Sequence, residues 1–200
     1  MPDIKTIRNK WFNQIGDEVQ CNTDEHMMLL LVIGLVMNEN FVLVDFNQES
    51  TLENWFTVDD VVMGGRSSSR LEINEQGHAV FSGNVSLDNN GGFSSLRHVF
   101  EMLDMESFQT IALRVKGDGL RYQLRVKSSR SERHSYTYSF DTSGTWQWIE
   151  IPLSEMSPSW RGTNLNIPNY PAQTLEEIGI LIGNKKPEAF KLEIDKILLK

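Results

Sequence analysis

The amino-acid sequence predicts an all-β sandwich, and three features of its pattern lead to this fold class. After residue 40, apolar and polar residues alternate with period two over many short segments, the pattern of strands with one buried face. Glycine, proline and asparagine separate these segments at short intervals. Long helical patterns are missing between them. Short strands at this spacing indicate a sandwich or a barrel and argue against an α/β fold.

The predicted strands follow one another from residue 41 to the end of the chain. The first is a continuous apolar segment, and the next two lie on either side of the turn Asn89-Asn90-Gly91-Gly92. The predicted strands cover 41–46, 80–87, 93–100, 111–116, 121–127, 136–140, 146–153, 178–182 and 190–199.

The clearest alternation lies on both sides of Gly117-Asp118-Gly119. Apolar residues occupy every second position over 111–115 and again over 122–126. Two alternating segments around a glycine-aspartate turn predict a β-hairpin.

The final strand contains a phase error in its pattern. Phe190, Leu192 and Ile194 occupy even positions, whereas Ile197 and Leu199 occupy odd ones. A regular strand would place the two groups on opposite faces and would bury charged neighbours with one of them. One extra residue restores the phase, so we predict a β-bulge at 195–196. The alternative is a strand end that is buried on both faces, with Leu198 packed as well.

Composition and charge exclude several classes of function. The chain has 200 residues and a net charge of −8, which argues against nonspecific binding to nucleic acid or to an anionic membrane. A single cysteine permits neither an intrachain disulfide nor a cysteine-based zinc site. The glycines form neither a dinucleotide-binding nor a phosphate-binding motif, and the serines lack a hydrolase frame. We therefore expect no cofactor, no nucleotide and no catalytic site.

Residues 1–40 form a leader of uncertain status before the predicted domain at 41–200. The apolar segment 27–37 is too short to cross a bilayer, which takes about 20 residues. It resembles the core of a signal peptide, but acidic residues precede it and no cleavage site follows. There are two alternatives to a signal peptide. The biological start of the chain could lie at Met27 or Met28, or segment 27–37 could be buried against the sandwich. We expect a soluble cytoplasmic protein, or an exported one if 27–37 acts as a signal.

The most unusual segment is 59–67, with the sequence DDVVMGGRS. Asp59 and Asp60 could form an acid/base pair or bind a hard metal ion. Adjacent residues of a strand point to opposite faces, however, so the two carboxylates would not share one substrate. We favour the interpretation that Asp60 hydrogen-bonds the turn, while Gly64 and Gly65 supply positive φ or a close backbone approach.

Aromatic and basic residues offer two further interpretations. Trp146 and Trp148 share a sheet face and could stack on sugar rings, although we favour burial of the tryptophans in the core. The polar face of the predicted hairpin forms a positive patch that suits an acidic protein surface, or a solvated sheet face with cross-strand pairs. That patch contains Arg114, Lys116, Arg121, Arg125 and Lys127.

A metal site is not expected. Asp45 and Asp195, near the first and last strands, are weak candidates for a structural calcium ion, which needs six to eight oxygen ligands. Two carboxylates with backbone carbonyls could suffice, yet more sites with two acidic residues are empty than filled.

Several motifs, in this order along the chain, resemble the CIA30 family, the complex I intermediate-associated protein 30 family. The most specific are Trp55, the VDDVVMGGRS segment 58–67 and the NNGGFSS segment 89–95. The other matching segments are 81–83, 116–119 with Tyr122, 148–152, 158–162 and 190–197.

This resemblance implies a galactose-binding-like jelly roll, similar to carbohydrate-binding modules. It also implies a non-catalytic, chaperone-like assembly factor for NADH:ubiquinone oxidoreductase (complex I), which binds a protein partner; a carbohydrate-binding module with a glycan ligand is the alternative. The residues expected to bind are Asp60, Met63, Gly64, Gly65, Arg66, Asn90, Gly91, Gly92, Arg121, Arg125, Trp160 and Arg161.

Overall fold

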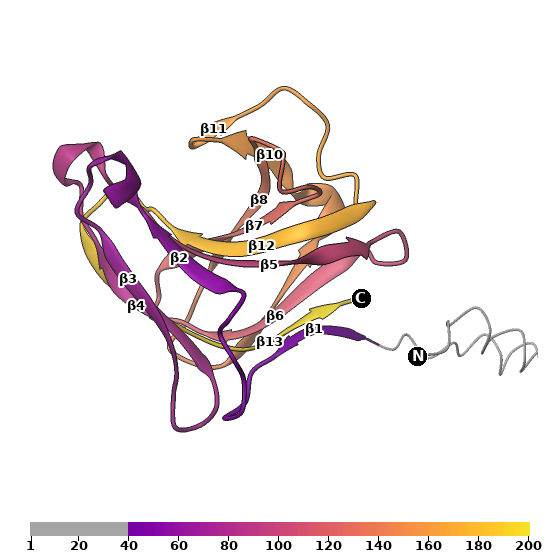
Figure 1. Ribbon diagram of the computed structural model, residues 1–200, viewed down its shortest axis with the longest axis horizontal. Helices are drawn as coiled ribbons and strands as arrows, with labels where there is room; N and C mark the ends of the chain where they lie inside the picture. The colour runs from indigo at the N-terminus through magenta and orange to yellow at the C-terminus, as the bar shows by residue number, and fades with distance from the viewer. Residues whose placement is uncertain (1–39) are drawn as a thin grey trace, which may run out of the picture. The chain divides into compact units, whose positions relative to one another are not determined.

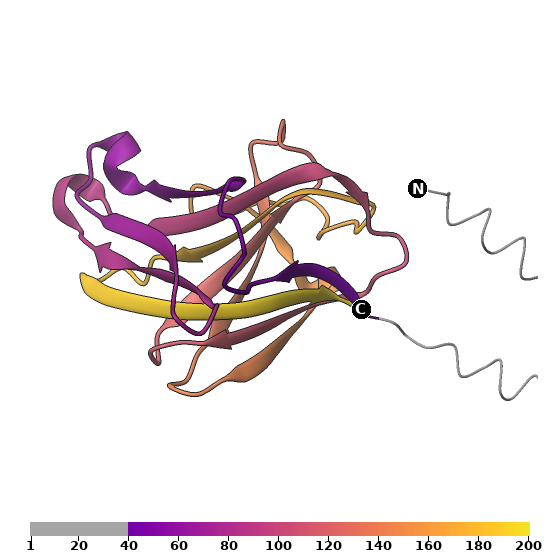
Figure 2. The same cartoon turned by 60° about the horizontal axis from the view of Figure 1, so that its bottom comes forward.

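The computed structural model describes residues 40–200, which form two antiparallel sheets packed face to face (Figures 1 and 2). The expectations for the leader, including segment 27–37, lie outside the described residues. Within 40–200 the helical pieces are three short 3₁₀ turns, and none is long and apolar enough to cross a membrane. The predicted β-sandwich is confirmed.

The first sheet has six strands in the order β3-β4-β13-β6-β9, with β1 also paired to β13. Strand β13 (Glu188–Leu199) is central, because β4 pairs with its first half, β1 with its last residues and β6 with the opposite side. The other members are β1 (Phe41–Asp45), β3 (Ser68–Ile73), β4 (Ala79–Val85), β6 (Thr110–Lys116) and β9 (Gln147–Pro152).

The second sheet has seven strands in the order β11-β10-β8-β7-β12-β5-β2. Its long central members are β5 (Ser94–Asp104) and β12 (Thr174–Ile182). The others are β2 (Trp55–Asp59), β7 (Arg121–Lys127), β8 (Ser135–Asp141), β10 (Ser157–Trp160) and β11 (Thr163–Asn164).

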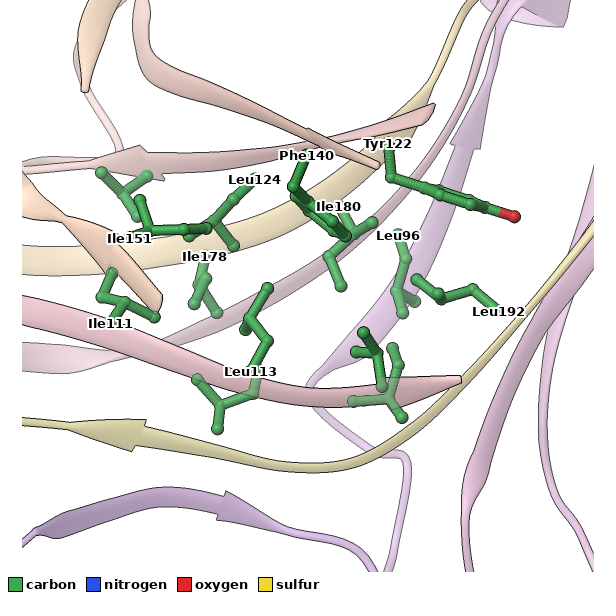
Figure 3. Packing of buried hydrophobic residues seen from close by; sticks show 14 of the residues in the cluster. Leu96, Ile111, Leu113, Tyr122, Leu124, Phe140, Ile151, Ile178, Ile180 and Leu192 are labelled. Atoms are coloured by element: carbon green, nitrogen blue, oxygen red, sulfur yellow. The ribbon is translucent and has the colours of Figure 1, made fainter. Parts of the chain in front are cut away.

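The core lies between the two sheets and contains the residues that the period-two pattern marked as buried (Figure 3). From the first sheet, Ile111 and Leu113 of β6 have no exposed surface. From the second sheet, Tyr122 and Leu124 of β7 are equally enclosed. Each fully buried side chain of this size stabilises the fold by roughly 1.5–3 kcal/mol, so the alternation itself explains why the sheets pack.

The predicted hairpin over 111–127 is wrong. Strand β6 pairs with β13 and β9, whereas β7 pairs with β8 and β12 in the other sheet. The chain crosses between the sheets at 117–120, where the Asp118 carboxylate accepts hydrogen bonds from the Lys191 amide (2.7 Å) and the Tyr122 hydroxyl (3.1 Å). Alternation identifies a buried face in each strand but not the neighbour with which the strand pairs.

The predicted bulge in β13 is confirmed. The pairing of β13 with β6 shifts between Ile194, opposite Val115, and Lys196, opposite Arg114. Asp195 is therefore the extra residue, and Ile194 and Ile197 both enter the core. On the other face Leu198 is buried as well, so the end of the strand is covered on both sides.

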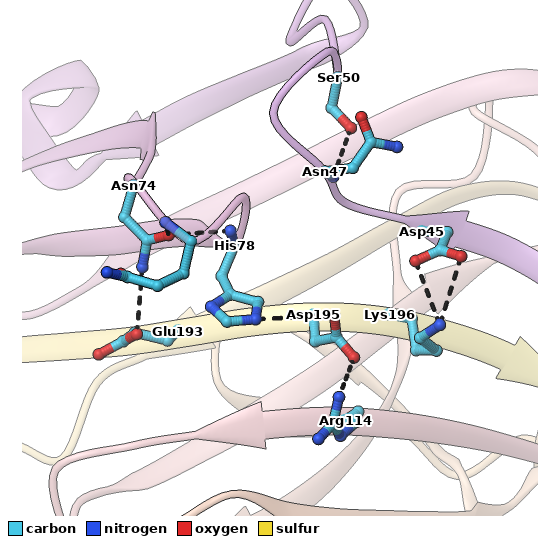
Figure 4. A network of polar contacts seen from close by, with 10 residues as sticks. Asp45, Asn47, Ser50, Asn74, His78, Arg114, Glu193, Asp195 and Lys196 are labelled. Atoms are coloured by element: carbon cyan, nitrogen blue, oxygen red, sulfur yellow. Dashed lines mark hydrogen bonds and ion pairs between the residues drawn. The ribbon is translucent and has the colours of Figure 1, made fainter.

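The displaced Asp195 is buried, and its charge is compensated by Arg114, with His78 nearby (Figure 4). Its carboxylate lies 2.7 Å from the Arg114 guanidinium and 3.9 Å from the His78 ring. The bulge therefore places the Asp195 carboxylate next to Arg114, which the pairing of β13 with β6 brings near.

Substitution of Ile197 by alanine tests the bulge. Because Ile197 is only 1% exposed, the variant Ile197→Ala should lower the free energy of unfolding by about 2–5 kcal/mol. The neighbouring Lys196→Ala should change it by less than about 1 kcal/mol, since its pair with Asp45 is largely solvated. Urea unfolding followed by tryptophan fluorescence measures both. Equal effects of the two substitutions would contradict the bulge.

Candidate binding site

A fully buried carboxylate, that of Asp60, organises the end of strand β2. The strand ends at Asp59 and runs directly into the 3₁₀ turn η1 (Asp60–Met63). The carboxylate accepts hydrogen bonds from the Gly92 amide (2.6 Å), the Ser67 amide (2.9 Å) and the Phe93 amide (3.3 Å), and from the Ser67 hydroxyl. One side chain thus joins the loop after β2 to the loop before β5. We call this arrangement the Asp60 clasp.

Two glycines make the clasp sterically possible. A Cβ atom on Gly65 would lie 2.2 Å from the Asp60 carboxylate, and one on Gly91 would lie 2.5 Å from it. Gly64 ends the turn with φ of 91°, which favours glycine. The interpretation that Asp60 hydrogen-bonds the turn, with Gly64 at positive φ and Gly65 in close approach, is confirmed.

The alternative of an acid/base pair is wrong in its geometry, because the two carboxylates hold different partners. Asp59 accepts hydrogen bonds from the amide (2.9 Å) and the hydroxyl (2.6 Å) of Ser69. Asp60 holds Ser67 and the backbone of the other loop. Ser67 and Ser69, which were not among the predicted site residues, join the start of β3 to this loop.

The electrostatics of Asp60 favour the ionised form. Burial raises the pKa of its carboxyl group, but the hydrogen bonds from the Ser67 hydroxyl and from the Gly92, Ser67 and Phe93 amides together outweigh burial. The pKa therefore lies below its ordinary value of 3.8. Asp60 is a structural anion and not a proton donor at neutral pH.

The clasp presents an apolar tip to solvent. Val61, Val62 and Met63 are 59%, 74% and 58% exposed, and Leu87 in the facing loop is 42% exposed. We define these four residues as the apolar tip. Solvated loops seldom carry three consecutive large apolar side chains, so an arrangement of this kind indicates a contact surface.

Polar contacts also join the two loops that carry the apolar tip. The Asn89 side chain donates a hydrogen bond to the Gly64 carbonyl (3.0 Å), and Arg66 lies 3.9 Å from Asp88. Asn89 and Asn90 both adopt left-handed φ, at 55° and 60°. Eight of the predicted binding residues thus belong to one loop pair: Asp60, Met63, Gly64, Gly65, Arg66, Asn90, Gly91 and Gly92.

The other four predicted residues lie elsewhere. Arg121 and Arg125 are on the outer face of β7. Because β6 and β7 belong to different sheets, these two arginines are separated from Arg114 and Lys116. The predicted single positive patch is therefore wrong. Trp160 and Arg161 lie at the turn between β10 and β11, where the Arg161 guanidinium is 4.9 Å from the Trp160 ring centroid.

Four tryptophans fall within the described residues, and the expectation that they fill the core is wrong for Trp148 and Trp160, which are 46% and 41% exposed. Trp55 is partly buried and packs against the core, with its ring 5.3 Å from that of Phe46. Each of the four rings also has a cation or a histidine against it. Trp55 stacks on His98 at 4.5 Å, Trp146 lies under Arg114 at 5.3 Å, Trp148 under Lys200 at 5.8 Å and Trp160 under Arg161.

The two candidate calcium ligands are each paired with a cationic side chain. Lys196 lies 3.2 Å from the Asp45 carboxylate, and Arg114 lies 2.7 Å from that of Asp195 (Figure 4). Among residues 40–200 no group of three or more histidine, cysteine or acidic side chains is arranged to hold a metal ion.

Comparisons with known proteins agree with the fold and with the motifs. The profile of the family described as "Complex I intermediate-associated protein 30 (CIA30)" matches residues 44–194. "Complex I intermediate-associated protein 30, mitochondrial" of Mus musculus is 25% identical over 82% of this chain and 57% of its own length. A probable Caenorhabditis briggsae counterpart is 29% identical over 96% of this chain and 64% of its own. The chain thus spans less than two thirds of either relative.

A solved structure with the same fold is the family 11 carbohydrate-binding module of Clostridium thermocellum, in complex with a mixed-linked tetrasaccharide. It superposes with a TM-score of 0.58 at 20% identity, over 80% of this chain and 94% of the module. At this identity the likeness shows the fold alone, which is the galactose-binding-like jelly roll that the motifs implied.

The variant Asp60→Asn should weaken the clasp. The asparagine side chain has only one acceptor oxygen, so it cannot accept all of the hydrogen bonds that the carboxylate receives. Its buried NH₂ group would also face the N–H and O–H donors of the loop. We expect a loss of about 3 kcal/mol in the free energy of unfolding at neutral pH. The exposed Asp88→Asn in the same loop pair is the control and should change little. Similar losses in both variants would contradict the clasp.

The effect of Asp60→Asn should also depend on pH. Because the folded pKa of Asp60 lies below the unfolded value, its contribution is fully present above the unfolded pKa and is lost as pH falls through the folded pKa. The difference in unfolding free energy between the native chain and Asp60→Asn should therefore be constant above about pH 5 and shrink in acid. Chemical denaturation at a series of pH values measures this difference.

Proposed function

The chain belongs to the CIA30 family, and from this membership we propose that it is a non-catalytic, chaperone-like assembly factor for complex I that works by binding a protein partner. The observation that carries the proposal is the apolar tip, which the Asp60 clasp holds exposed on a rigid frame. The names of the mouse and nematode relatives associate those proteins with complex I intermediates.

The apolar tip has the chemistry of a protein interface. Interfaces are enriched in methionine and place apolar side chains at their centre within a polar rim. Here Val62 and Met63 form the centre, and Arg66 and Asp88 provide charged groups at the edge.

The rigidity of the tip favours binding. A loop fixed in its bound conformation loses less entropy on association. The hydrogen bonds to Asp60 and the contact from Asn89 fix this loop in the free protein.

Two features support a function without catalysis. Asp60, the most enclosed carboxylate of the loop pair, is committed to four hydrogen bonds within the protein. Of the three described histidines, His78 contacts Asp195 and Trp146, and His98 contacts Trp55 and Asn54. His134 packs on Tyr136 and lines the pocket beside Trp160. An enzyme would need an ionisable group that is free to meet a substrate.

Glycan binding is the alternative. Trp148 and Trp160 are 46% and 41% exposed, and each has one cation against its ring, so a sugar could stack only on the other face. A shallow pocket of about 260 Å³ beside Trp160, lined also by Arg133, His134 and Leu165, is where an oligosaccharide would be sought.

The site of action follows from the proposed role. The relatives are named as mitochondrial proteins, which gives the expected cytoplasmic location no support. We propose that the chain acts where complex I is assembled.

Affinity purification of the tagged full chain from its native cells tests the proposal. The double variant Val62→Asp/Met63→Asp should reduce recovery of complex I subunits, measured by mass spectrometry, by roughly tenfold or more, the loss expected for an interface centre. Met102→Asp is the matched control, because Met102 is also exposed (67%) but lies on β5 away from the loops.

Each variant should first be shown to keep the thermal transition of the native chain. Recovery that is unchanged in the double variant, or equally reduced in Met102→Asp, would refute the apolar tip as the interface. Binding to a glycan array, with no complex I subunit recovered, would instead establish the alternative.

A further inference from the structure

The outer face of the seven-stranded sheet carries one row of residues that crosses five strands. The pairings place Thr137 of β8 opposite Arg125 of β7, Arg125 opposite Gly179 of β12, Gly179 opposite Arg97 of β5, and Arg97 opposite Phe56 of β2. Figure 1 shows β7, β12 and β5 side by side. Two arginines therefore lie on either side of a glycine, in the middle of the sheet.

Gly179 is buried, and it places no side chain between the two arginines. A Cβ atom there would lie 2.8 Å from the Leu96 carbonyl oxygen and 3.5 Å from Cγ of Arg97. The stem of Arg97 therefore passes close to the glycine. Strand spacing puts the two arginine backbones roughly 10 Å apart, a span that two arginine side chains can bridge through one small anion.

The charges of this row are not balanced. Arg97 lies 3.7 Å from the carboxylate of Glu177, which is the acidic group between the two arginines. Arg125 donates a hydrogen bond to the neutral side chain of Gln123 at 3.2 Å. Burial, followed by the charge of Arg97, lowers the pKa of Arg125, and Glu177 opposes this only in part. Two partly buried guanidinium groups thus share one carboxylate.

We propose that Arg97 and Arg125 bind the carboxylate of an acidic segment of the protein partner, laid across the outer face of the seven-stranded sheet above Gly179. This inference rests on the proposed function and names the chemistry of the partner. A guanidinium offers paired N–H donors that match the two oxygens of a carboxylate. A carboxylate from the partner would add the second negative charge that the two arginines need, since Glu177 supplies only one.

The surroundings of the arginines favour a protein segment over an acidic glycan. Phe56, which is 42% exposed, ends the row beside Arg97 and offers an apolar contact next to the positive charge. Val99 and Leu181 of the neighbouring strands are partly buried on the same face. An acidic residue flanked by apolar residues satisfies both kinds of contact, whereas a polyuronate carries hydroxyl groups at each ring.

Titration with labelled hexaglutamate, followed by fluorescence anisotropy, tests the site. The net charge of −8 opposes nonspecific attraction of a polyanion, so saturable binding requires a local cation site. Arg97→Gln and Arg125→Gln should each weaken binding by roughly tenfold, the effect of one charge-assisted contact. Arg121→Gln should change it by less than about twofold, because that residue is exposed and paired with Asp141 at 3.3 Å.

Arg121 is a matched control because it lies on β7 and on the same outer face as Arg125. The variant Arg125→Lys keeps the charge but loses the paired donors, and should retain part of the affinity. Absence of saturable hexaglutamate binding, or an equal loss in Arg121→Gln, would overturn the proposal. Binding of oligogalacturonate in place of hexaglutamate would overturn the protein partner in favour of an acidic glycan. The capture experiment with Val62 and Met63 is independent, so either idea can fail alone.

Discussion

The carboxylate of Asp60 has no contact with solvent, and every hydrogen bond that it needs comes from the loops around it. A buried charge without partners would cost several kcal/mol, so the loops must adopt the geometry that supplies those donors. That geometry requires glycines at 65 and 91, where any side chain would collide with the carboxylate. It also forces η1 outward, which leaves Val61, Val62 and Met63 in solvent. The stability of the clasp and the exposure of the apolar tip have the same cause.

The two outer faces of the sandwich differ in how their charges are used. On the first sheet, Arg114 and Lys116 each face a partly buried carboxylate, that of Asp195 and that of Glu193. In each of these pairs the carboxylate balances the charge of the cation. On the second sheet, Arg97 and Arg125 share Glu177. The pairing of the strands brings these two arginines to either side of Gly179, with Glu177 as their shared carboxylate.

The fold by itself does not decide the function. A jelly-roll sandwich of this kind is found in carbohydrate-binding modules, yet fold alone does not carry a ligand preference. The side chains decide, and here the exposed rings of Trp148 and Trp160 each have a cation, from Lys200 and Arg161, against one face. The exposed apolar loop and the unbalanced arginines are features that a protein partner would satisfy.

Local patterns in the sequence predicted most of the long strands and the roles of Asp60 and Asp195, but missed β2, β3, β10 and β11. The strands follow from alternation, and the bulge at Asp195 follows from a phase error that only an extra residue can correct. The role of Asp60 follows from its position before a glycine pair. The pairing between strands is different, because the alternation in one strand does not indicate which strand lies beside it. The hairpin over 111–127 and the single positive patch were therefore wrong. Only the tertiary structure brings Gly179 between Arg97 and Arg125, since these residues meet through pairings between segments far apart in the chain.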